Sequence, residues 1–547
     1  MVLGALVLVV LVLLLLPPPA RLLDPAGGPA APGLVLRAAD GSTLLAEDPA
    51  PGPPADPPSL VRAAFEAALG ELPRGVPAVL GTPCADGGAS GPLSLRLADT
   101  LLAGDPGSSL RCLRVRLAAL WFELGLSPEE HLRAWLARAR IGTAFGVERA
   151  ARRYFGRPAR ELDPLQAAML AGLAGLPPHL SPLHTPATAR RRAREVLLAL
   201  AARGVLSPAE AERWARATLH LGRWPESGRD AVDAALRDLV RFGPPAGELV
   251  AETAVDPALQ RAVERAVARH LAGLPQVEAA VVVLDPGGQI AALFGGRARI
   301  GPNRALDLPR QPGSAFKLLV YAAALEAGWR PDDPIEDAPV VIDGWSPGNV
   351  DGRFHGTVTL ERAFAHSYNA AAVRLQERVG RARIVRLARA LGIRAPLAPL
   401  PSLALGTREL TPLELARATW ALVHGRTTTA PTVVRVWEAG RRAFETAEAG
   451  AAVPVSRGTR ESLKRMMRAA VRSGTAREAA VPGLDVGAKT GTSQDGRDGW
   501  IAGFAGDHVI AVWVGRDDAR PVPDLAGGGV PARIFRDVAA SLTTPGS

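Results

Sequence analysis

The chain contains very little lysine. Lys+Arg total 64, yet only Lys317, Lys464 and Lys489 are lysines. Arginine keeps its proton in a protein, whereas a lysine that is buried or lies beside another cation can lose it. Arginine therefore supplies nearly all of the positive charge. Each lysine marks a position where an amine that can lose its proton could be needed. Lys464 lies in a basic, helix-like stretch and is interpreted as an ordinary surface residue.

Cysteine is also scarce, and the histidines form no cluster. The chain has two cysteines, Cys84 and Cys112, and nine histidines without an H-x-x-x-H or similar spacing. This excludes the usual sequence patterns of metal sites, so we expect no metal ion and no other cofactor. In an oxidising compartment the two cysteines could form a disulfide, and two buried thiols are the alternative.

Aromatic residues make up only 5% of the chain, and no aromatic–basic platform is visible. We therefore expect no nucleic-acid partner. The net charge is +10, and residues 59–225 hold 22 Arg against 14 Asp+Glu, which places +8 there. A basic segment near a membrane suits anionic lipid headgroups or a pyrophosphate-bearing lipid, and a solvated basic face is the alternative.

Only one long apolar run is present, at the N-terminus. Val2 to Leu16 is apolar apart from Gly4 and is followed by three prolines. As a helix it would reach about 22 Å, short of the ~30 Å hydrocarbon core of a bilayer. We interpret residues 1–16 as a membrane anchor or uncleaved signal, and a cleaved signal peptide is the alternative. The prediction is a single-pass protein of the inner (cytoplasmic) membrane with the rest of the chain in the periplasm or extracytoplasmic space.

The remaining sequence divides into four parts. Residues 17–58 are interpreted as a linker with a short hairpin around Asp40-Gly41. Residues 59–225 have mostly helical patterns, and residues 226–248 are interpreted as a second linker. From residue 249 to residue 547 helices and strands alternate, which predicts an α+β domain with an antiparallel sheet.

Local signals support this division. In "SPEEHLRAWLARARIG", Ser127 is a candidate N-cap with Glu130 three residues later, and the helix is expected to end at Gly142. The stretch "VEAAVVVLDPGGQIAALFGG" predicts strand, turn and strand. "DGWIAGFAGDHVIAVWVGRD" predicts another strand pair with its turn at Gly506-Asp507.

A serine and a lysine stand together in "RQPGSAFKLLVYAAALEAGW". Ser314 falls in the first turn of a predicted helix, and Lys317 follows three residues later on the same face. A neutral amine there could take the serine proton, and the helix N-terminus favours the resulting negative charge. Alone, the S-x-x-K pattern fits a capping serine with a surface lysine equally well.

Two further motifs favour the catalytic interpretation. "AHSYNAAAVRL" contains Ser367 and Asn369 in the pattern S-x-N, and the run Lys489–Thr492 reads K-T-G-T. S-x-x-K, S-x-N and K-T-G, in this order, are the signature set of serine β-lactamases and penicillin-binding proteins. A K-T-G motif on an edge strand would let an extended peptide pair alongside it, and Lys489 would help to lower the pKa of Lys317.

From about Leu249 onward the chain resembles the transpeptidase domain of class A penicillin-binding proteins, through "DPALQ", "PGSAFK" and "RDGWIAGF…VWVG". The resemblance implies a serine transpeptidase/β-lactamase-like fold, with a five-stranded antiparallel sheet flanked by helices. It implies that Ser314 attacks the carbonyl of a D-Ala-D-Ala stem peptide and that Lys317 is the base. Ser367 and Asn369 would relay the proton to the leaving D-alanine and orient the acyl chain.

The same resemblance assigns the K-T-G residues. Lys489 would act in catalysis and, with Thr490, would contribute positive field and hydrogen bonds to the substrate carboxylate. Gly491 and Thr492 are the further expected substrate-binding residues. The backbone N–H groups of Ser314 and Thr492 would form the oxyanion hole.

The segment 59–225 resembles a family-51 glycosyltransferase domain, which polymerises glycan strands from lipid II, through "GVERAARRYFGRPARELDPLQAAMLAGLAGLPPHLSP". The resemblance implies a mostly α-helical, lysozyme-like domain. Its catalytic Glu-Asp pair, however, falls on Ala68 and Leu69 here. The family's Arg-Lys-x-x-Glu appears as "RCLRV", with Cys112 and Val115 at the lysine and glutamate positions.

Because deprotonating a sugar hydroxyl needs a carboxylate or an equivalent base, we expect this domain to keep the fold and to have lost glycosyl transfer. Glu66 or Glu71 could substitute if the alignment is displaced.

The expected function is that of a penicillin-sensitive peptidoglycan D,D-transpeptidase. Its expected partners are peptidoglycan stem peptides, β-lactam antibiotics and membrane lipid, with lipid II and other cell-wall synthesis proteins as further candidates. Two alternatives stay open. One is a D,D-carboxypeptidase or β-lactamase-like hydrolase, and the other is a non-catalytic penicillin-binding scaffold.

Overall fold

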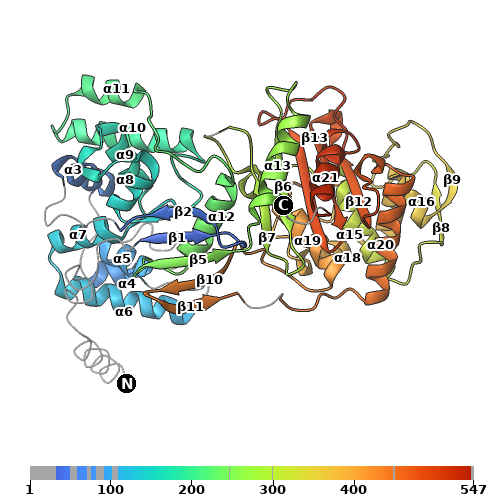
Figure 1. Ribbon diagram of the computed structural model, residues 1–547, viewed down its shortest axis with the longest axis horizontal. Helices are drawn as coiled ribbons and strands as arrows, with labels where there is room; N and C mark the ends of the chain where they lie inside the picture. Colours follow the sequence, from blue (N-terminus) through green and yellow to red (C-terminus); the bar gives the residue numbers. More distant parts are fainter. Residues whose placement is uncertain are drawn as a thin grey trace.

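The computed structural model describes residues 33–49, 58–70, 76–81, 92–101, 109–245, 247–298, 300–446 and 450–543. They form two domains with a mixed β-sheet beside the junction (Figure 1). The apolar run Val2–Leu16 and Cys84 lie outside the described residues, so the membrane segment stays a prediction. Cys112 is disulfide-bonded. Within the described ranges, no helix is both long and apolar enough to cross a bilayer.

The N-terminal domain is mostly helical, as predicted. Helix α7 (Pro128–Arg138) starts where Ser127 caps it: the Ser127 hydroxyl accepts from the Glu130 N–H, and the Glu130 carboxylate accepts from the Ser127 N–H at 2.7 Å. The predicted end at Gly142 is wrong. The helix stops at Arg138 because the chain turns into the short strands β3 (Arg140–Ile141) and β4 (Ala144–Phe145).

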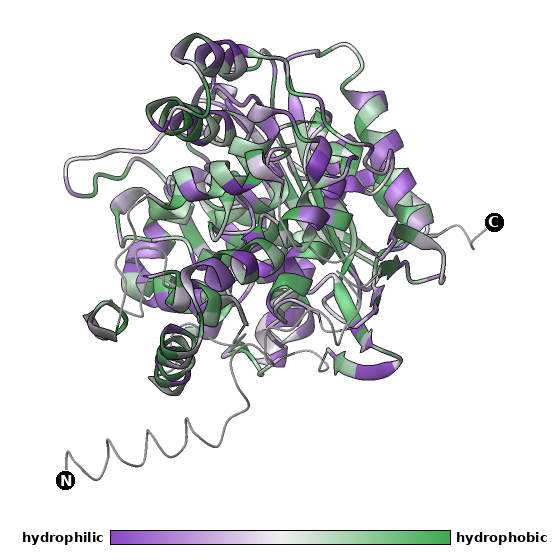
Figure 2. Cartoon of the chain, turned by 90° about the vertical axis from the view of Figure 1, so that its left-hand side faces the viewer, coloured by the Kyte–Doolittle hydropathy of each residue, from purple (hydrophilic) through white to green (hydrophobic). Residues whose placement is uncertain are grey.

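The other helices of this domain pack around one apolar core. They are α3 (Ser59–Leu69), α4 (Val76–Gly81), α5 (Leu93–Leu101), α6 (Ser109–Gly125), α8 (Val147–Phe155), η2 (Ala159–Glu161), α9 (Pro164–Leu173), α10 (Pro186–Ala202) and α11 (Pro208–Arg216). In the view onto this domain, its helices carry mixed hydrophilic and hydrophobic residues (Figure 2).

The sheet beside the junction draws on three distant parts of the chain. Its strand order is β11-β10-β5-β1-β2. Strands β1 (Leu34–Arg37) and β2 (Thr43–Glu47) form the hairpin that the sequence predicts around Asp40-Gly41. Strand β1 also pairs in parallel with β5 (Leu249–Thr253), which in turn pairs with β10 (Val433–Glu438). The last strand, β11 (Arg441–Glu445), follows β10. The sequence analysis did not predict this arrangement.

The C-terminal domain is built on the five-stranded antiparallel sheet that the resemblance implies, in the order β12-β13-β14-β6-β7. The predicted strand pairs are present as β6 (Glu278–Leu284) with β7 (Ile290–Phe294), and β13 (Asp498–Ala505) with β14 (His508–Gly515). Strand β12 (Val486–Thr492) carries the K-T-G motif at one edge. Nearly every residue of these strands is buried, because helices cover both faces (Figure 1).

Helices α13 (Pro257–His270) and α21 (Val530–Ser541) lie on one face of this sheet, and α19 (Pro412–His424) and α20 (Arg457–Arg472) lie on the other. The remaining elements are α14 (Arg304–Asp307), η3 (Gly313–Phe316), α15 (Lys317–Glu326), β8 (Pro334–Asp337), β9 (Gly356–Thr359), α16 (Leu360–Ala365), α17 (Asn369–Val379), α18 (Arg381–Ala390), η4 (Pro401–Leu405), η5 (Arg477–Ala479) and η6 (Gln494–Gly496).

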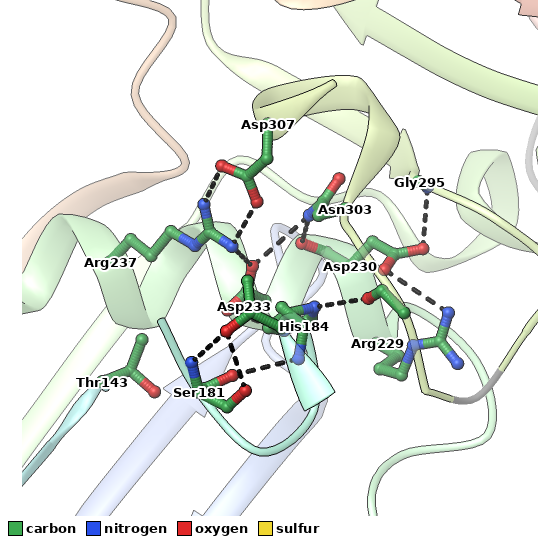
Figure 3. A network of polar contacts seen from close by, with 12 residues as sticks. Thr143, Ser181, His184, Arg229, Asp230, Asp233, Arg237, Gly295, Asn303 and Asp307 are labelled. Carbon is green, nitrogen blue, oxygen red and sulfur yellow. Dashed lines mark hydrogen bonds and ion pairs between the residues drawn. The ribbon is translucent and has the colours of Figure 1, made fainter. Parts of the chain in front are cut away.

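A buried polar network fastens the two domains to each other (Figure 3). The segment predicted as a linker, 226–248, contains helix α12 (Arg229–Val240). From α12, Asp233 forms ion pairs with His184 of the N-terminal domain (3.0 Å) and with Arg237 (2.8 Å). Arg237 continues to Asp307 of the C-terminal domain with two hydrogen bonds of 2.7 and 2.8 Å. Side chains from both domains therefore meet on α12.

The contacts in this network shift the pKa values of Asp233 and His184. Burial by itself would raise the pKa of Asp233, but His184 and Arg237 hold it well below its usual range. Burial by itself would lower the pKa of His184, but the Asp233 carboxylate raises it above the ordinary value. The stabilisation from Asp233 is therefore present above its unfolded pKa. That from His184 is complete below its unfolded pKa and is lost as the pH rises through the raised folded value.

We expect His184→Gln to destabilise the full chain by about 3 kcal/mol at pH 6, because it leaves a buried aspartate with one cation fewer. At pH 9.5 the loss should be smaller, because less of the folded His184 is then charged. Thermal unfolding at the two pH values measures this. The exposed His179 provides the matched control His179→Gln, and an equal loss for His184→Gln at both pH values would contradict the analysis.

Candidate active site

The predicted nucleophile lies in a tight turn. Ser314 belongs to the 3-10 turn η3, and the α-helix itself begins only at Lys317. Ser314 is half-buried, and within the described chain its hydroxyl forms no hydrogen bond. Gly313 has φ 55°, and a Cβ there would collide with the backbone of Thr492. The turn is therefore packed directly against the end of the K-T-G strand, which a larger residue would prevent.

Lys317 is fully buried and points toward the S-x-N motif. Its Nζ donates to the backbone oxygen of Ser367 and to Oδ1 of Asn369, both at 2.7 Å. Ser367 Oγ lies at 3.3 Å. A neutral amine has two N–H bonds and one lone pair. The two short contacts account for both N–H bonds, which leaves the lone pair for a hydroxyl proton.

The pKa of Lys317 favours this neutral form. Burial lowers it well below its usual value, Lys489 lowers it further, and Asp337 opposes the shift. Lys489 is also fully buried, and burial lowers its pKa to about 7. Its Nζ donates to Ser367 Oγ and to the Thr490 backbone oxygen, each at 2.9 Å. Both amines thus converge on the hydroxyl of Ser367.

The S-x-N motif is held in an unusual backbone conformation. Ser367 has φ 63° and precedes α17, which begins at Asn369. For a residue other than glycine, this left-handed conformation costs about 1–2 kcal/mol. The turn presents the Ser367 carbonyl and hydroxyl to the same amine, so the strain accompanies a functional arrangement.

The K-T-G residues line the edge of the sheet beside the nucleophile. A Cβ on Gly491 would collide with the Pro312 carbonyl oxygen, so the glycine lets the turn approach the strand. The Thr490 hydroxyl lies 2.6 Å from that of Thr475, and the Thr492 hydroxyl accepts from the Gly527 N–H at 3.1 Å. The Thr492 backbone nitrogen lies beside Gly313, where an oxyanion-hole donor is expected.

The structure thus brings all three motifs into one region, from η3, α15, α17 and β12. Sequence reasoning missed the residues that support them, above all Asn349, Asp337 and Thr475. Asn349 had one detectable signal, since it is one of only three asparagines in the chain. Asp337 and Thr475 carry no comparable signal, because they act through contacts with distant segments.

A second candidate site lies in the N-terminal domain. A cavity of about 570 Å³ opens between α3, α5, α6 and α7, and Glu66, Glu123 and Glu129 are among its lining residues. Leu69, at the expected aspartate position, also lines it, whereas Ala68 is exposed. Glu71 lies outside the described residues.

The comparisons with known proteins match both domains. Residues 279–540 match the family model of the penicillin binding protein transpeptidase domain, and residues 87–201 match that of the transglycosylase. The chain belongs to the class A penicillin-binding proteins. The two matches correspond to the C-terminal domain with the three motifs and to the helical domain with the cavity.

Individual relatives support the assignment of the chain to this family. Penicillin-binding protein 1A of Neisseria meningitidis is 34% identical over 273 residues, which cover 47% of this chain and 34% of that protein. The chain therefore spans about a third of the length of the curated relatives it matches first. The structure of PonA1 from Mycobacterium tuberculosis in complex with penicillin V has 28% identity and TM-score 0.51, covering 55% of this chain and 87% of that one.

A penicillin-binding protein structure also covers both domains. Penicillin-Binding Protein 1A from Haemophilus influenzae is similar over 94% of this chain and 93% of that one, with TM-score 0.56 and 19% identity. At this identity the similarity shows the two-domain fold alone. The helical and α+β domains predicted from the sequence are therefore those of a class A penicillin-binding protein.

We expect the strain at Ser367 to be measurable with two substitutions. Ser367→Ala and Ser367→Gly both remove the hydroxyl, but only glycine adopts φ 63° without steric cost. The glycine variant should be more stable than the alanine variant by about 0.5–1 kcal/mol, after the larger unfolded-state entropy of glycine is subtracted. Chemical denaturation of the two variants measures this difference, and an alanine variant that is the more stable would contradict it.

Proposed function

We propose that the chain is a peptidoglycan D,D-transpeptidase that works through an acyl-serine at Ser314. One observation carries the proposal: two buried lysine amines converge on the Ser367 hydroxyl beside a serine turn packed onto the K-T-G strand. This arrangement supplies a nucleophile, an amine whose lowered pKa favours its neutral form, and a strand edge for an extended peptide. The proposed catalytic residues are Ser314, Lys317, Ser367, Asn369 and Lys489.

The acylation step follows from these contacts. The Ser314 oxygen bonds to the carbonyl carbon of the penultimate D-alanine while its proton passes to Lys317 Nζ. The N–H groups of Ser314 and Thr492 hold the resulting oxyanion. As the carbon–nitrogen bond breaks, the Ser367 hydroxyl hands a proton to the leaving D-alanine and is reprotonated from the lysines. Thr490, Gly491 and Thr492 bind the substrate along the edge strand, with Lys489 providing positive field.

The acyl-enzyme is then consumed by an acceptor. In a transpeptidase an amine of a second stem peptide attacks the ester, and Ser314 regains its proton. In a D,D-carboxypeptidase or β-lactamase-like hydrolase, water would take that place. The two-domain architecture of class A penicillin-binding proteins favours the transpeptidase. A non-catalytic scaffold is disfavoured because no structural role requires two buried amines with lowered pKa values at one serine.

β-Lactams are the proposed inhibitors. A relative of similar fold, PonA1, has been solved in complex with penicillin V. We further propose that the protein is anchored in the inner membrane, with both domains outside the cytoplasm and in contact with membrane lipid. Lipid II and other cell-wall synthesis proteins are proposed partners at that surface.

We propose that the N-terminal domain has lost glycosyl transfer while keeping its fold. Two observations support this. Ala68 and Leu69 replace the expected carboxylates, and Val115 at the third position is buried. The cavity does hold carboxylates, but Glu66 is paired with Arg62 at 3.0 Å, and Arg62 also contacts Glu129 at 3.3 Å. The Glu66 carboxylate is thus already engaged by Arg62, which disfavours it as a substitute base.

We expect purified full-length protein to be labelled by a fluorescent penicillin, with the label on the peptide that contains Ser314. Ser314→Ala should lose the label completely while melting like the wild type. Mass spectrometry of the digested protein locates the modified residue. Adding a D-Ala-D-Ala peptide with and without an amine acceptor then separates transpeptidation from hydrolysis, and labelling at another residue would overturn the proposal.

With lipid II as substrate, we expect the full chain to form no glycan polymer above background, because the proposed base is missing. Gel separation of the products, with an active class A enzyme as positive control, checks this. If polymer does form, Glu66→Gln should abolish it and Glu129→Gln should not. Polymer formation in itself would refute the loss of glycosyl transfer.

A further inference from the structure

One loop reaches the active site without belonging to any of the three motifs. It joins β8 to β9 and comprises residues 338–355. Within it, Asn349 is buried, with 9% of its surface exposed, although its neighbour Val350 is almost fully exposed. A buried amide in a mostly exposed loop must be hydrogen-bonded, so its partners identify its role.

Asn349 bonds to the S-x-N motif with one end and to the domain interior with the other. Its Oδ1 accepts from the backbone N–H of Asn369 at 2.6 Å and from that of Ala370 at 3.4 Å. Its Nδ2 donates to Asp337 Oδ2 at 2.7 Å and to the Arg353 backbone oxygen at 2.8 Å. Asn349 thus ties the start of α17 to strand β8.

Gly348, the residue before Asn349, also binds Asn369. The Gly348 carbonyl accepts from Asn369 Nδ2 at 2.7 Å. Because one end of the amide is thereby occupied, the other end, Oδ1, faces Lys317 Nζ at 2.7 Å. The loop therefore decides both where Asn369 sits and which of its atoms meets the lysine.

The loop is held in place by the buried carboxylate of Asp337. Asp337 is fully buried, and its Oδ2 accepts from Asn349, from the His355 N–H and from the His355 ring at 3.0 Å. The His355 ring stacks on Tyr368 with centroids 4.1 Å apart. Asn349 is therefore fixed by a buried carboxylate, and the middle residue of the S-x-N motif is fixed by the same loop.

We propose that Asn349 is a positioning residue for acyl transfer. Through Asn369 it fixes the acceptor for one N–H of Lys317, so that the lone pair of the neutral amine is left free to take the Ser314 proton. During acylation that proton moves to Lys317 Nζ as the serine oxygen bonds to the substrate carbonyl carbon. The inference rests on the proposed function, since it concerns the same serine.

The test measures acylation kinetics with a fluorescent penicillin, using the full chain. For Asn349→Ala we expect the acylation rate constant to fall about 10- to 100-fold, because small misplacements of a catalytic group have effects of this size. The dissociation constant of the initial complex should change less than threefold. The final stoichiometry of labelling should equal that of the wild type, which shows that the slower protein is folded.

Asn303 offers a matched control. It is a buried asparagine that contacts a buried aspartate, Asp233, at 3.4 Å, but it lies at the domain junction. Asn303→Ala should lower the melting temperature and leave the acylation rate constant within twofold of the wild type. Equal slowing by both substitutions, or an unchanged rate constant in Asn349→Ala, would overturn the proposal. Absence of labelling in the wild type would instead overturn the proposed function.

If Asn349→Ala does not fold, Asn349→Asp keeps the proposal testable. Aspartate retains the oxygen that accepts from Asn369, and a protonated carboxyl can also donate to Asp337 in place of the lost Nδ2–H. The other charged or titratable groups facing this pair are His355 and, beyond Asn369, Lys317. We expect the aspartate variant to keep at least a third of the wild-type acylation rate constant at pH 6. A rate constant reduced more than tenfold in a fully labelled aspartate variant would overturn the proposal.

Discussion

The candidate active site depends on the burial of two lysine amines around one hydroxyl. Lys317 and Lys489 are both fully buried, and both lie within 3.3 Å of Ser367 Oγ. Two unit positive charges this close to one oxygen repel by roughly 3 kcal/mol at an effective dielectric constant of about 20. Burial and this repulsion together lower the pKa of Lys317 and favour its neutral form. The same physics explains why arginine, which serves almost everywhere else in this chain, cannot replace either residue.

To act as a base, a neutral amine needs a lone pair that forms no other hydrogen bond and is accessible to the proton it accepts. Nearby acceptors take up the N–H bonds of Lys317, and the half-exposed Ser314 forms no competing hydrogen bond within the described structure. Close backbone contacts at Gly313 and Gly491 then set the serine turn against the K-T-G strand. The glycines set the position of the serine turn by allowing close backbone contact with the strand. The polar side chains set the orientation of the Lys317 amine.

Much of this could be predicted from the sequence, because the decisive signals are local. The S-x-x-K, S-x-N and K-T-G patterns each occupy a few consecutive residues, and turn residues mark the strand pairs β6–β7 and β13–β14. What could not be predicted depends on contacts between distant segments. The sheet that joins β1 to β5 and β10, the bond from Asn349 to Asn369, and the meeting of His184, Asp233 and Asp307 have no periodicity or spacing that would reveal them.

The domain junction gives the helical domain a structural role that does not require glycosyl transfer. Strand β1 is hydrogen-bonded on both sides, by β2 and β5, and β5 continues to β10 from the C-terminal domain. The carboxylate of Glu47 on β2 is bound by Arg153 of α8 at 2.6 Å, and His184 is bound by Asp233 of α12. Removing the helical domain would therefore leave the buried Asp233 with one cation fewer and would expose an edge of the sheet. Such a domain would be kept for folding even after its own catalytic residues had changed.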